Sequence, residues 1–317
     1  MPRHPDFVPQ GVIPAVLLPF HTDFSIDEAS FRAHLRDVAS VQGLSAITVN
    51  AHSTEVASCT LDEQRRVMEI AGDEIGGKLP IVHGVWADGS LEAARIARQA
   101  QSGGASALLV FPPAPFTISQ TADMALAHFR TIADATDLPL IVFQYPLATG
   151  QGYPAATLER LFEAVPTIRA IKDWTPLVPQ HESHIRALQG RKRPINVLST
   201  NSAWLLSSLV LGCNGLLSGS GSVIADLQAR LFRAVKANDL AEARRLNDRI
   251  YPTARVFYAD PFVDMHNRMK EALVLLGKLP RAVVRPPLVK ITDAEIARIR
   301  AALIEAGLLD AGARDAA

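Results

Sequence analysis

The sequence predicts an α/β protein folded as a (β/α)8 TIM barrel with a C-terminal helical extension. Short apolar runs alternate with helical segments eight times in about 225 residues, and a repeat of roughly 25 to 30 residues is typical of a closed barrel. The runs are continuously apolar, which indicates parallel strands that are covered on both faces. A doubly wound open sheet ranks second, because the glycine-rich phosphate fingerprint that follows its first strand is missing.

The apolar runs set the order of the expected elements along the chain. The eight strands are expected at residues 11–19, 45–50, 79–83, 107–111, 138–143, 167–172, 195–198 and 215–218. The spacing of apolar residues between these runs is helical, as Phe31, Leu35 and Val38 illustrate in the first case. The helices are expected at residues 27–41, 61–75, 90–101, 123–135, 156–164, 181–188, 203–211 and 223–237. Thr60 is the expected N-cap of the second helix.

The chain beyond residue 238 has a wholly helical pattern. Helices are expected at residues 240–258, 261–276 and 292–306, and a Pro286-Pro287 pair separates the last two. We therefore predict a barrel over residues 1–238 and a helical region over residues 239–317 that packs on it. The first ten residues are expected to form a loose arm.

Composition excludes several classes of function. The formal net charge is zero and the pI is near 7.1, so electrostatics gives no reason to expect nucleic acid or an anionic membrane as a partner. No apolar run is long enough to span a bilayer, and the first residues lack the apolar core of a signal peptide. The two cysteines, Cys59 and Cys213, are far apart in apolar surroundings and are expected to be reduced core thiols. A cytoplasmic location follows as the default.

Lys172 is the candidate nucleophile. It ends the apolar sixth strand, directly after Ala170 and Ile171, and reactive residues of such barrels gather at the carboxyl ends of strands. A lysine in a desolvated pocket has a lowered pKa, and its neutral amine can attack a carbonyl group. The competing interpretation is a lysine that leaves the sheet and points into solvent.

Two polar loops follow other strands. His52, Ser53 and Thr54 lie after the second strand, where hydroxyl and backbone N–H groups can hold a carboxylate, although turn and capping chemistry would use the same residues. Ser218 and Gly219 open the helix after the eighth strand, and a flexible helix N-terminus can hold a phosphate, a carboxylate or nothing. The P-loop lysine and the G-x-S-x-G motif of hydrolases are both missing.

A metal site is not expected. His52, His83 and Asp88 all lie at strand ends, but none of the paired ligand spacings of zinc enzymes is present. The histidines at 181, 184 and 266, together with Arg268, are expected at the surface or in packing.

Short motifs in a fixed order then bring out a family resemblance. They are Gly11-Val-Ile-Pro-Ala, Pro19-Phe20, Ser53-Thr54-Glu55, Gly84, Phe111-Pro112-Pro113, Tyr145-Pro146, Thr149-Gly150, Ile171-Lys172-Asp173 and Gly215-Leu-Leu-Ser218. Over about residues 11 to 310 the chain resembles the dihydrodipicolinate synthase / N-acetylneuraminate lyase family. The resemblance implies a homo-oligomer, usually a tetramer of paired dimers, that uses no metal or other cofactor. It also implies that Lys172 forms a Schiff base with pyruvate or another 2-oxo acid, whose carboxylate Ser53 and Thr54 would hold.

The chain also departs from the pattern of this family. Phe143 stands where the resemblance implies a proton-relay tyrosine. Tyr145, two residues later on the same strand face, is the candidate replacement, and the alternative is that its phenol only packs. The tyrosine that synthases lend across a dimer would fall among residues 113–115, where none is present, and Ala148 replaces their substrate-binding arginine. Trp174 and His52 instead indicate a pocket with apolar or aromatic walls.

These features predict a Schiff-base lyase that is not a true dihydrodipicolinate synthase. The reaction would be an aldol cleavage or condensation, a hydro-lyase reaction that removes water, or a hydratase-aldolase reaction, on a 2-oxo acid. Tyr145 and Lys172 would be catalytic, and Phe143 would join the loops above in binding the substrate. Two alternatives stay open: a catalytically impaired barrel that binds a 2-oxo acid without turnover, and a metal-dependent barrel lyase.

Overall fold

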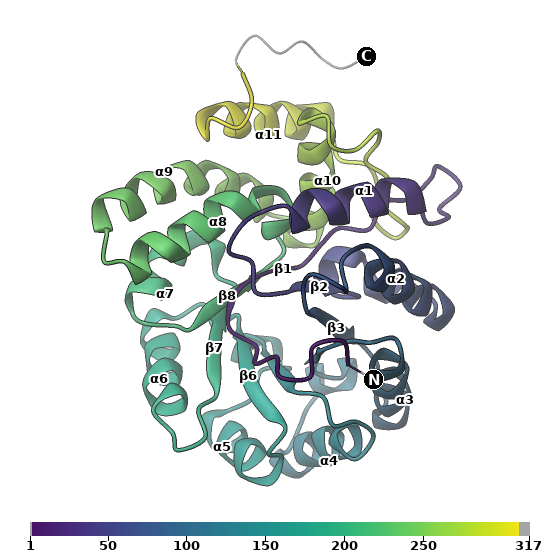
Figure 1. The fold of residues 1–317 in the computed structure, drawn as a ribbon, viewed down its shortest axis with the longest axis vertical. Helices are drawn as coiled ribbons and strands as arrows, with labels where there is room; N and C mark the ends of the chain where they lie inside the picture. The colour runs from purple at the N-terminus through teal and green to yellow at the C-terminus, as the bar shows by residue number, and fades with distance from the viewer. Residues whose placement is uncertain (1, 311–317) are drawn as a thin grey trace.

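A computed structural model describes residues 2–310, in which eight parallel strands are surrounded by helices (Figure 1). The strands are β1 (Gly11–Pro14), β2 (Ile47–Val49), β3 (Ile81–Val85), β4 (Ala107–Val110), β5 (Leu140–Gln144), β6 (Ile168–Asp173), β7 (Asn196–Ser199) and β8 (Gly215–Ser218). The barrel helices are α1 (Glu28–Ala39), α2 (Leu61–Glu74), α3 (Ser90–Ser102), α4 (Ala122–Ala133), α5 (Ala155–Ala164), α6 (Val178–Gln189), α7 (Leu205–Val210) and α8 (Gly221–Lys236). The C-terminal helices are α9 (Leu240–Phe257), α10 (Met265–Leu275) and α11 (Asp293–Glu305).

The strands form the predicted barrel. Each strand from β2 to β8 pairs in parallel with its neighbour in sequence, and β1 pairs with β8. Isolated bridges from Val12 to Leu44 and from Ala15 to Thr48 connect the remaining edges of β1 and β2. The C-terminal helices lie against one side of the barrel, with α9 beside α8 and α11 beyond α10 (Figure 1). The proposed boundary near residue 238 stays a prediction, and residues 311–317 of the second unit lie outside the described part.

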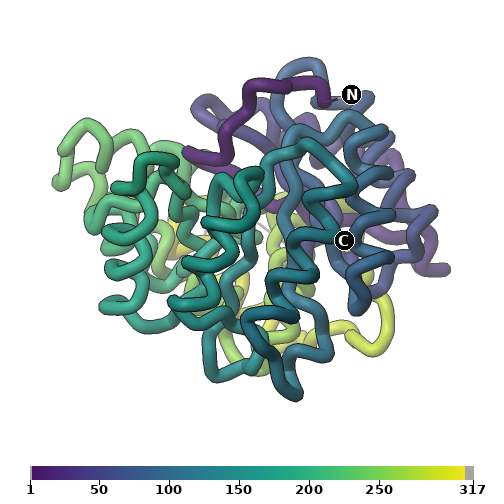
Figure 2. The backbone as a smooth tube through the Cα atoms, turned by 90° about the horizontal axis from the view of Figure 1, so that it is seen from below, coloured from purple at the N-terminus to yellow at the C-terminus, as the bar shows by residue number. Residues whose placement is uncertain are grey.

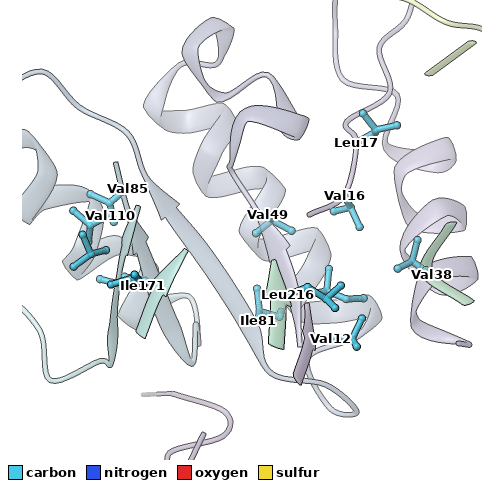
Figure 3. Packing of buried hydrophobic residues seen from close by; sticks show 14 of the residues in the cluster. Val12, Val16, Leu17, Val38, Val49, Ile81, Val85, Val110, Ile171 and Leu216 are labelled. Atoms are coloured by element: carbon cyan, nitrogen blue, oxygen red, sulfur yellow. The ribbon is translucent and has the colours of Figure 1, made fainter. Parts of the chain in front are cut away.

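Strand alternation separates two hydrophobic cores. One side of the strands packs against the surrounding helices, and Val12, Val49, Ile81, Ile171 and Leu216 lie in this outer core (Figure 3). The other side fills the barrel interior. The inner core includes Ile13, Val82, Leu109, Ile141, Phe143, Ala170, Leu198 and Leu217.

Local chemistry explains where several elements begin and end. The Thr60 hydroxyl accepts the Glu63 N–H at 3.2 Å, and the Glu63 carboxylate accepts the Thr60 N–H at 2.8 Å, which confirms the expected N-cap. The first strand is shorter than its apolar run, because pairing with the neighbouring strands ends after the N–H groups of Ala15 and Val16. The Leu17 N–H instead donates to Ser222 Oγ at 3.0 Å, so residues 17–19 are buried without being a strand.

The N-terminal arm is not loose, contrary to the prediction. The Arg3 N–H donates to the Gly104 carbonyl at 3.3 Å, and the Asn196 amide donates to the Pro9 carbonyl at 2.9 Å. Phe7 packs against the inner core. The arm therefore covers the amino-terminal end of the strands, and it runs along one edge of the molecule in Figure 2.

Two further features concern the burial of the cysteines and the length of the helices. Cys59 is partly buried and Cys213 is buried, and neither forms a disulfide. Among the helices of residues 2–310, none combines the length and apolarity that crossing a membrane requires.

Candidate active site

Lys172 points into the barrel. Strand alternation in β6 turns Ala170 and Lys172 inward, whereas Ile171 and Asp173 face the helices. Its neighbour on β5 is Phe143, and the Lys172 ammonium lies 3.9 Å from the centre of that ring. The side chain is 6% exposed, and burial lowers the pKa of Lys172 to about 7. An amine in this environment is neutral in a large fraction of molecules at neutral pH.

The lysine lines a cavity at the carboxyl ends of the strands. The cavity holds about 680 Å³ of empty space. Its wall consists of Ala15, Ala51, His52, Ser53, Phe143, Lys172, Trp174, Thr200, Asn201, Ser202, Ala203, Gly219, Tyr258, Phe262, Met265 and His266. Among these described residues there is no aspartate, glutamate or arginine, so the substrate meets uncharged groups everywhere except at Lys172.

Aromatic rings form one side of this cavity. Trp174 stacks on Phe262 at a centroid distance of 5.2 Å, and Phe262 stacks on Tyr258 at 5.8 Å. Phe143 lies 6.3 Å from Trp174 and extends the same surface towards the lysine. The expected aromatic lining is therefore present, although two of its rings come from the C-terminal region.

His52 and Tyr145 form a hydrogen-bonded pair beside the lysine. Tyr145 directly follows β5, and its hydroxyl oxygen lies 2.7 Å from His52 Nε2. Burial lowers the pKa of His52 to about 3, with a further contribution from the charge of Lys172, and burial raises the pKa of Tyr145. Both groups are therefore uncharged at neutral pH and hold a proton between them. Tyr145 is not on the cavity wall, and His52 connects it to the cavity.

The hydroxyl groups expected around the substrate divide into two sets. Ser53 lines the cavity, is 1% exposed, and its Oγ has no hydrogen-bond partner within residues 2–310. The Thr54 hydroxyl instead accepts the Ala51 N–H at 2.6 Å and donates to the Ala51 carbonyl at 2.9 Å. Ser218 Oγ lies 2.9 Å from Ser220 Oγ, behind the wall to which Gly219 contributes. Ser53 and Gly219 thus face the cavity, whereas Thr54 and Ser218 do not.

Sequence reasoning missed the contribution of the C-terminal region. Tyr258, Phe262, Met265 and His266 all reach the cavity from residues that were expected only to pack on the barrel. His266 was expected at the surface or in packing, but it is buried at the cavity wall. No local motif marks these residues, because only the tertiary position of the segment from the end of α9 to the start of α10 brings them to the strand ends.

A buried polar network supports the strand that carries the lysine. Asp173 Oδ2 accepts hydrogen bonds from His181 Nδ1 at 2.9 Å and from His184 Nδ1 at 2.8 Å, and Asp173 Oδ1 accepts the Thr175 N–H at 2.9 Å. Burial raises the pKa of Asp173, but the two histidines outweigh this effect and hold the pKa well below its usual range. Both histidines were expected at the surface or in packing, and they pack in the buried interior against β6.

The strand-end residues considered for a metal do not converge. His83 is fully buried, and its Nε2 accepts a hydrogen bond from the Asn50 amide at 2.8 Å. Within residues 2–310, no group of three His, Cys, Asp or Glu side chains has the arrangement of a metal site.

Comparison with known proteins identifies the family. The profile of the dihydrodipicolinate synthetase family matches residues 8–306. The chain belongs to this family. It is 26% identical over 296 residues to the putative 2-dehydro-3-deoxy-D-gluconate aldolase YagE of Escherichia coli, covering 92% of this chain and 95% of YagE. It is 30% identical over 287 residues to the 4-hydroxy-tetrahydrodipicolinate synthase of Acidobacterium capsulatum, covering 90% of this chain and 91% of that enzyme.

Solved structures of the dihydrodipicolinate synthetase family share the fold. A crystal structure of YagE in complex with pyruvate superposes with a TM-score of 0.86 at 24% identity, over 94% of this chain and 99% of YagE. A monomeric dihydrodipicolinate synthase variant superposes with a TM-score of 0.87 at 23% identity, over 95% of this chain and 97% of the variant. Within this shared barrel, the paired His52 and Tyr145 and the ring of Phe143 are features of the present chain.

Proposed function

We propose that the protein is a lyase that forms a Schiff base between Lys172 and a 2-oxo acid. One observation carries the proposal: a buried lysine, with its pKa lowered to about 7, lies on the wall of a cavity whose other groups are uncharged. The YagE relative, which was crystallised in complex with pyruvate, supports a 2-oxo acid as the ligand. We also propose that the protein forms a dimer or a tetramer, which sedimentation of the purified protein checks. A cytoplasmic location is proposed as well.

The first step is attack of the neutral Lys172 amine on the C2 ketone. The C–N bond forms, the ketone oxygen takes up a proton, and loss of water leaves an iminium ion. Ser53 Oγ, which has no partner within the described residues, would donate its proton in a hydrogen bond to the substrate carboxylate. The positive iminium nitrogen then accepts the electron pair when a bond to C3 breaks, whether that bond is C3–H or C3–C4.

The hydrogen-bonded pair of His52 and Tyr145 is the proposed proton relay. Proton transfer through a positioned side chain typically contributes about 10²- to 10⁴-fold to a rate. His52 lies on the wall, and Tyr145 lies 2.7 Å behind its Nε2, so a proton taken up at the imidazole can be shared with the phenol. The pair would thus serve in place of a tyrosine at the position of Phe143.

The second substrate, or the product of cleavage, is proposed to be an uncharged aromatic or apolar aldehyde. The stacked rings of Trp174, Phe262 and Tyr258 offer flat apolar surface, whereas the wall offers no cation besides Lys172 within residues 2–310. An aldehyde with its own carboxylate would therefore leave that charge without a partner, which is costly in a desolvated site.

Reductive trapping tests the proposed function. Borohydride added with pyruvate should reduce the imine to a stable 1-carboxyethyl group on the amine, which mass spectrometry of peptides locates on Lys172. Lys172→Ala should lose the adduct, and Lys172→Arg is the matched variant that keeps the positive charge without a nucleophilic amine. The proposal is wrong if wild type forms no adduct with any of a panel of 2-oxo acids, or if the adduct survives Lys172→Ala.

A binding protein without turnover is the second candidate, and the position of Tyr145 off the cavity wall favours it. Exchange of the C3 hydrogens of pyruvate for deuterium, followed by NMR, separates the two candidates without knowledge of the aldehyde. A working relay gives both the Lys172 adduct and C3 exchange, whereas a binding protein gives the adduct alone.

A further inference from the structure

His266 has a buried imidazole ring that forms no hydrogen bond with another described residue. It lies in the first turn of α10, is 7% exposed and lines the cavity. Within residues 2–310 its ring forms neither a hydrogen bond nor an ion pair. Its nitrogens are therefore available at the cavity wall, where water or a ligand can accept or donate a hydrogen bond.

The ring and Ser53 both lie beside Gly219. A methyl group placed on Gly219 would lie 3.1 Å from His266 Nε2, which is a tight contact, and 4.0 Å from Ser53 Cβ. A glycine at this position therefore leaves the imidazole and the serine uncovered on the same part of the cavity wall. Ser53 Oγ is likewise without a partner among the described residues, so two unsatisfied polar groups meet at one point of the wall.

We propose that His266 binds the carboxylate of the 2-oxo acid, together with Ser53, in the space over Gly219. A carboxylate is the part of such a substrate that can accept two hydrogen bonds from neighbouring donors. The wall offers no arginine for this purpose among the described residues, so neutral donors must supply the recognition. This inference rests on the proposed Schiff-base function and makes the C-terminal region part of the substrate site.

The electrostatics of His266 agree with a neutral donor. Burial lowers the pKa of His266 well below its usual value, and the positive charges of neighbouring groups, including Lys172, lower it further. The ring therefore carries one proton at neutral pH, and the nitrogen that bears it can donate to a carboxylate oxygen.

The test measures the pyruvate concentration that gives half-maximal trapping on Lys172. His266→Leu removes the donor and should raise this concentration by about 10- to 100-fold, the usual effect of losing a hydrogen bond to a charged group, with little change at saturation. His266→Asn keeps an N–H donor and should recover part of the loss. Gly219→Ala fills the space with the histidine still present and should also raise the concentration.

Matched controls separate carboxylate binding from a general structural role. His128→Leu removes another buried imidazole, which is hydrogen-bonded with Ser90 at 3.0 Å and does not line the cavity. This variant should leave the pyruvate concentration for half-maximal trapping unchanged. With methyl pyruvate, which lacks the negative charge, His266→Leu should have less than about a threefold effect, since neutral hydrogen bonds contribute less. Thermal unfolding of each variant reports whether it is folded.

The outcomes distinguish this inference from the function on which it rests. If wild type forms no adduct, both fail. If wild type forms the adduct but His266→Leu has the wild-type pyruvate dependence, the carboxylate role alone is overturned. An equal effect on pyruvate and methyl pyruvate, or an asparagine variant no better than leucine, overturns it as well.

Discussion

Adduct formation at Lys172 should follow a titration centred near pH 7. Burial lowers the pKa of this lysine to about 7 from an ordinary value of 10.5. About half of the molecules then carry the neutral amine at pH 7, against roughly one in 3,000 for an unperturbed lysine. Below the midpoint the ammonium form dominates and cannot attack, so the rate should fall about tenfold for each pH unit below about 6. Above pH 8 the rate should level off, since nearly all of the amine is neutral.

The measurement is the initial rate of adduct formation with pyruvate and cyanoborohydride between pH 5 and pH 9. Peptide mapping by mass spectrometry reports Lys172 separately from exposed lysines such as Lys78, whose modification in the same sample corrects for the reagent's own pH dependence. Thermal unfolding at each pH verifies that the protein remains folded. A midpoint near pH 10 would refute the reasoning, because it would mean that the amine is solvated or paired with a carboxylate.

Three further predictions concern the relay, the pathway and the support of β6. Tyr145→Phe should lower C3 deuterium exchange of pyruvate by about 100-fold or more while leaving adduct formation within about threefold; equal losses in both would remove the relay role. Expression of the protein should not restore growth of a strain that lacks dihydrodipicolinate synthase, because Ala148 offers no cation for a second carboxylate, and restored growth would contradict this. Asp173→Asn should lower the free energy of unfolding by about 3 kcal/mol or more, because it removes the charge that pairs with two buried histidines; an unchanged urea midpoint would show that the network contributes little.

The fold could be predicted from sequence because its signal is repeated. Eight apolar runs at regular spacing identify a barrel even when individual strand ends are misplaced, as they are by up to two residues for β3 and β5. The run over residues 11–19 forms a strand only over residues 11–14, because burial and pairing are separate properties. Residues 17–19 are enclosed without strand pairing, and the N–H of Leu17 bonds with a serine.

The candidate site was predictable only in part, for a related reason. Lys172 was found because its strand fixes its direction, and strand direction can be read from alternation. The hydroxyls of Thr54 and Ser218 turn to local partners, which residue type alone does not reveal. His266 is separated from Lys172 by almost a hundred residues, and no local pattern shows that α10 reaches the strand ends.

A buried ion pair explains how the C-terminal region takes part in the site. The Lys270 ammonium donates to Glu55 Oε1 and to the Val283 carbonyl, the latter at 2.7 Å. Glu55 ends the short helix that carries His52 and Ser53, and Lys270 lies one helical turn beyond His266 on α10. One contact thus fixes the loop after β2 relative to the helix that provides the imidazole. A barrel reduced to residues 1–238 would keep Lys172 but lose this connection, so the division drawn from the sequence separates two parts of one cavity wall.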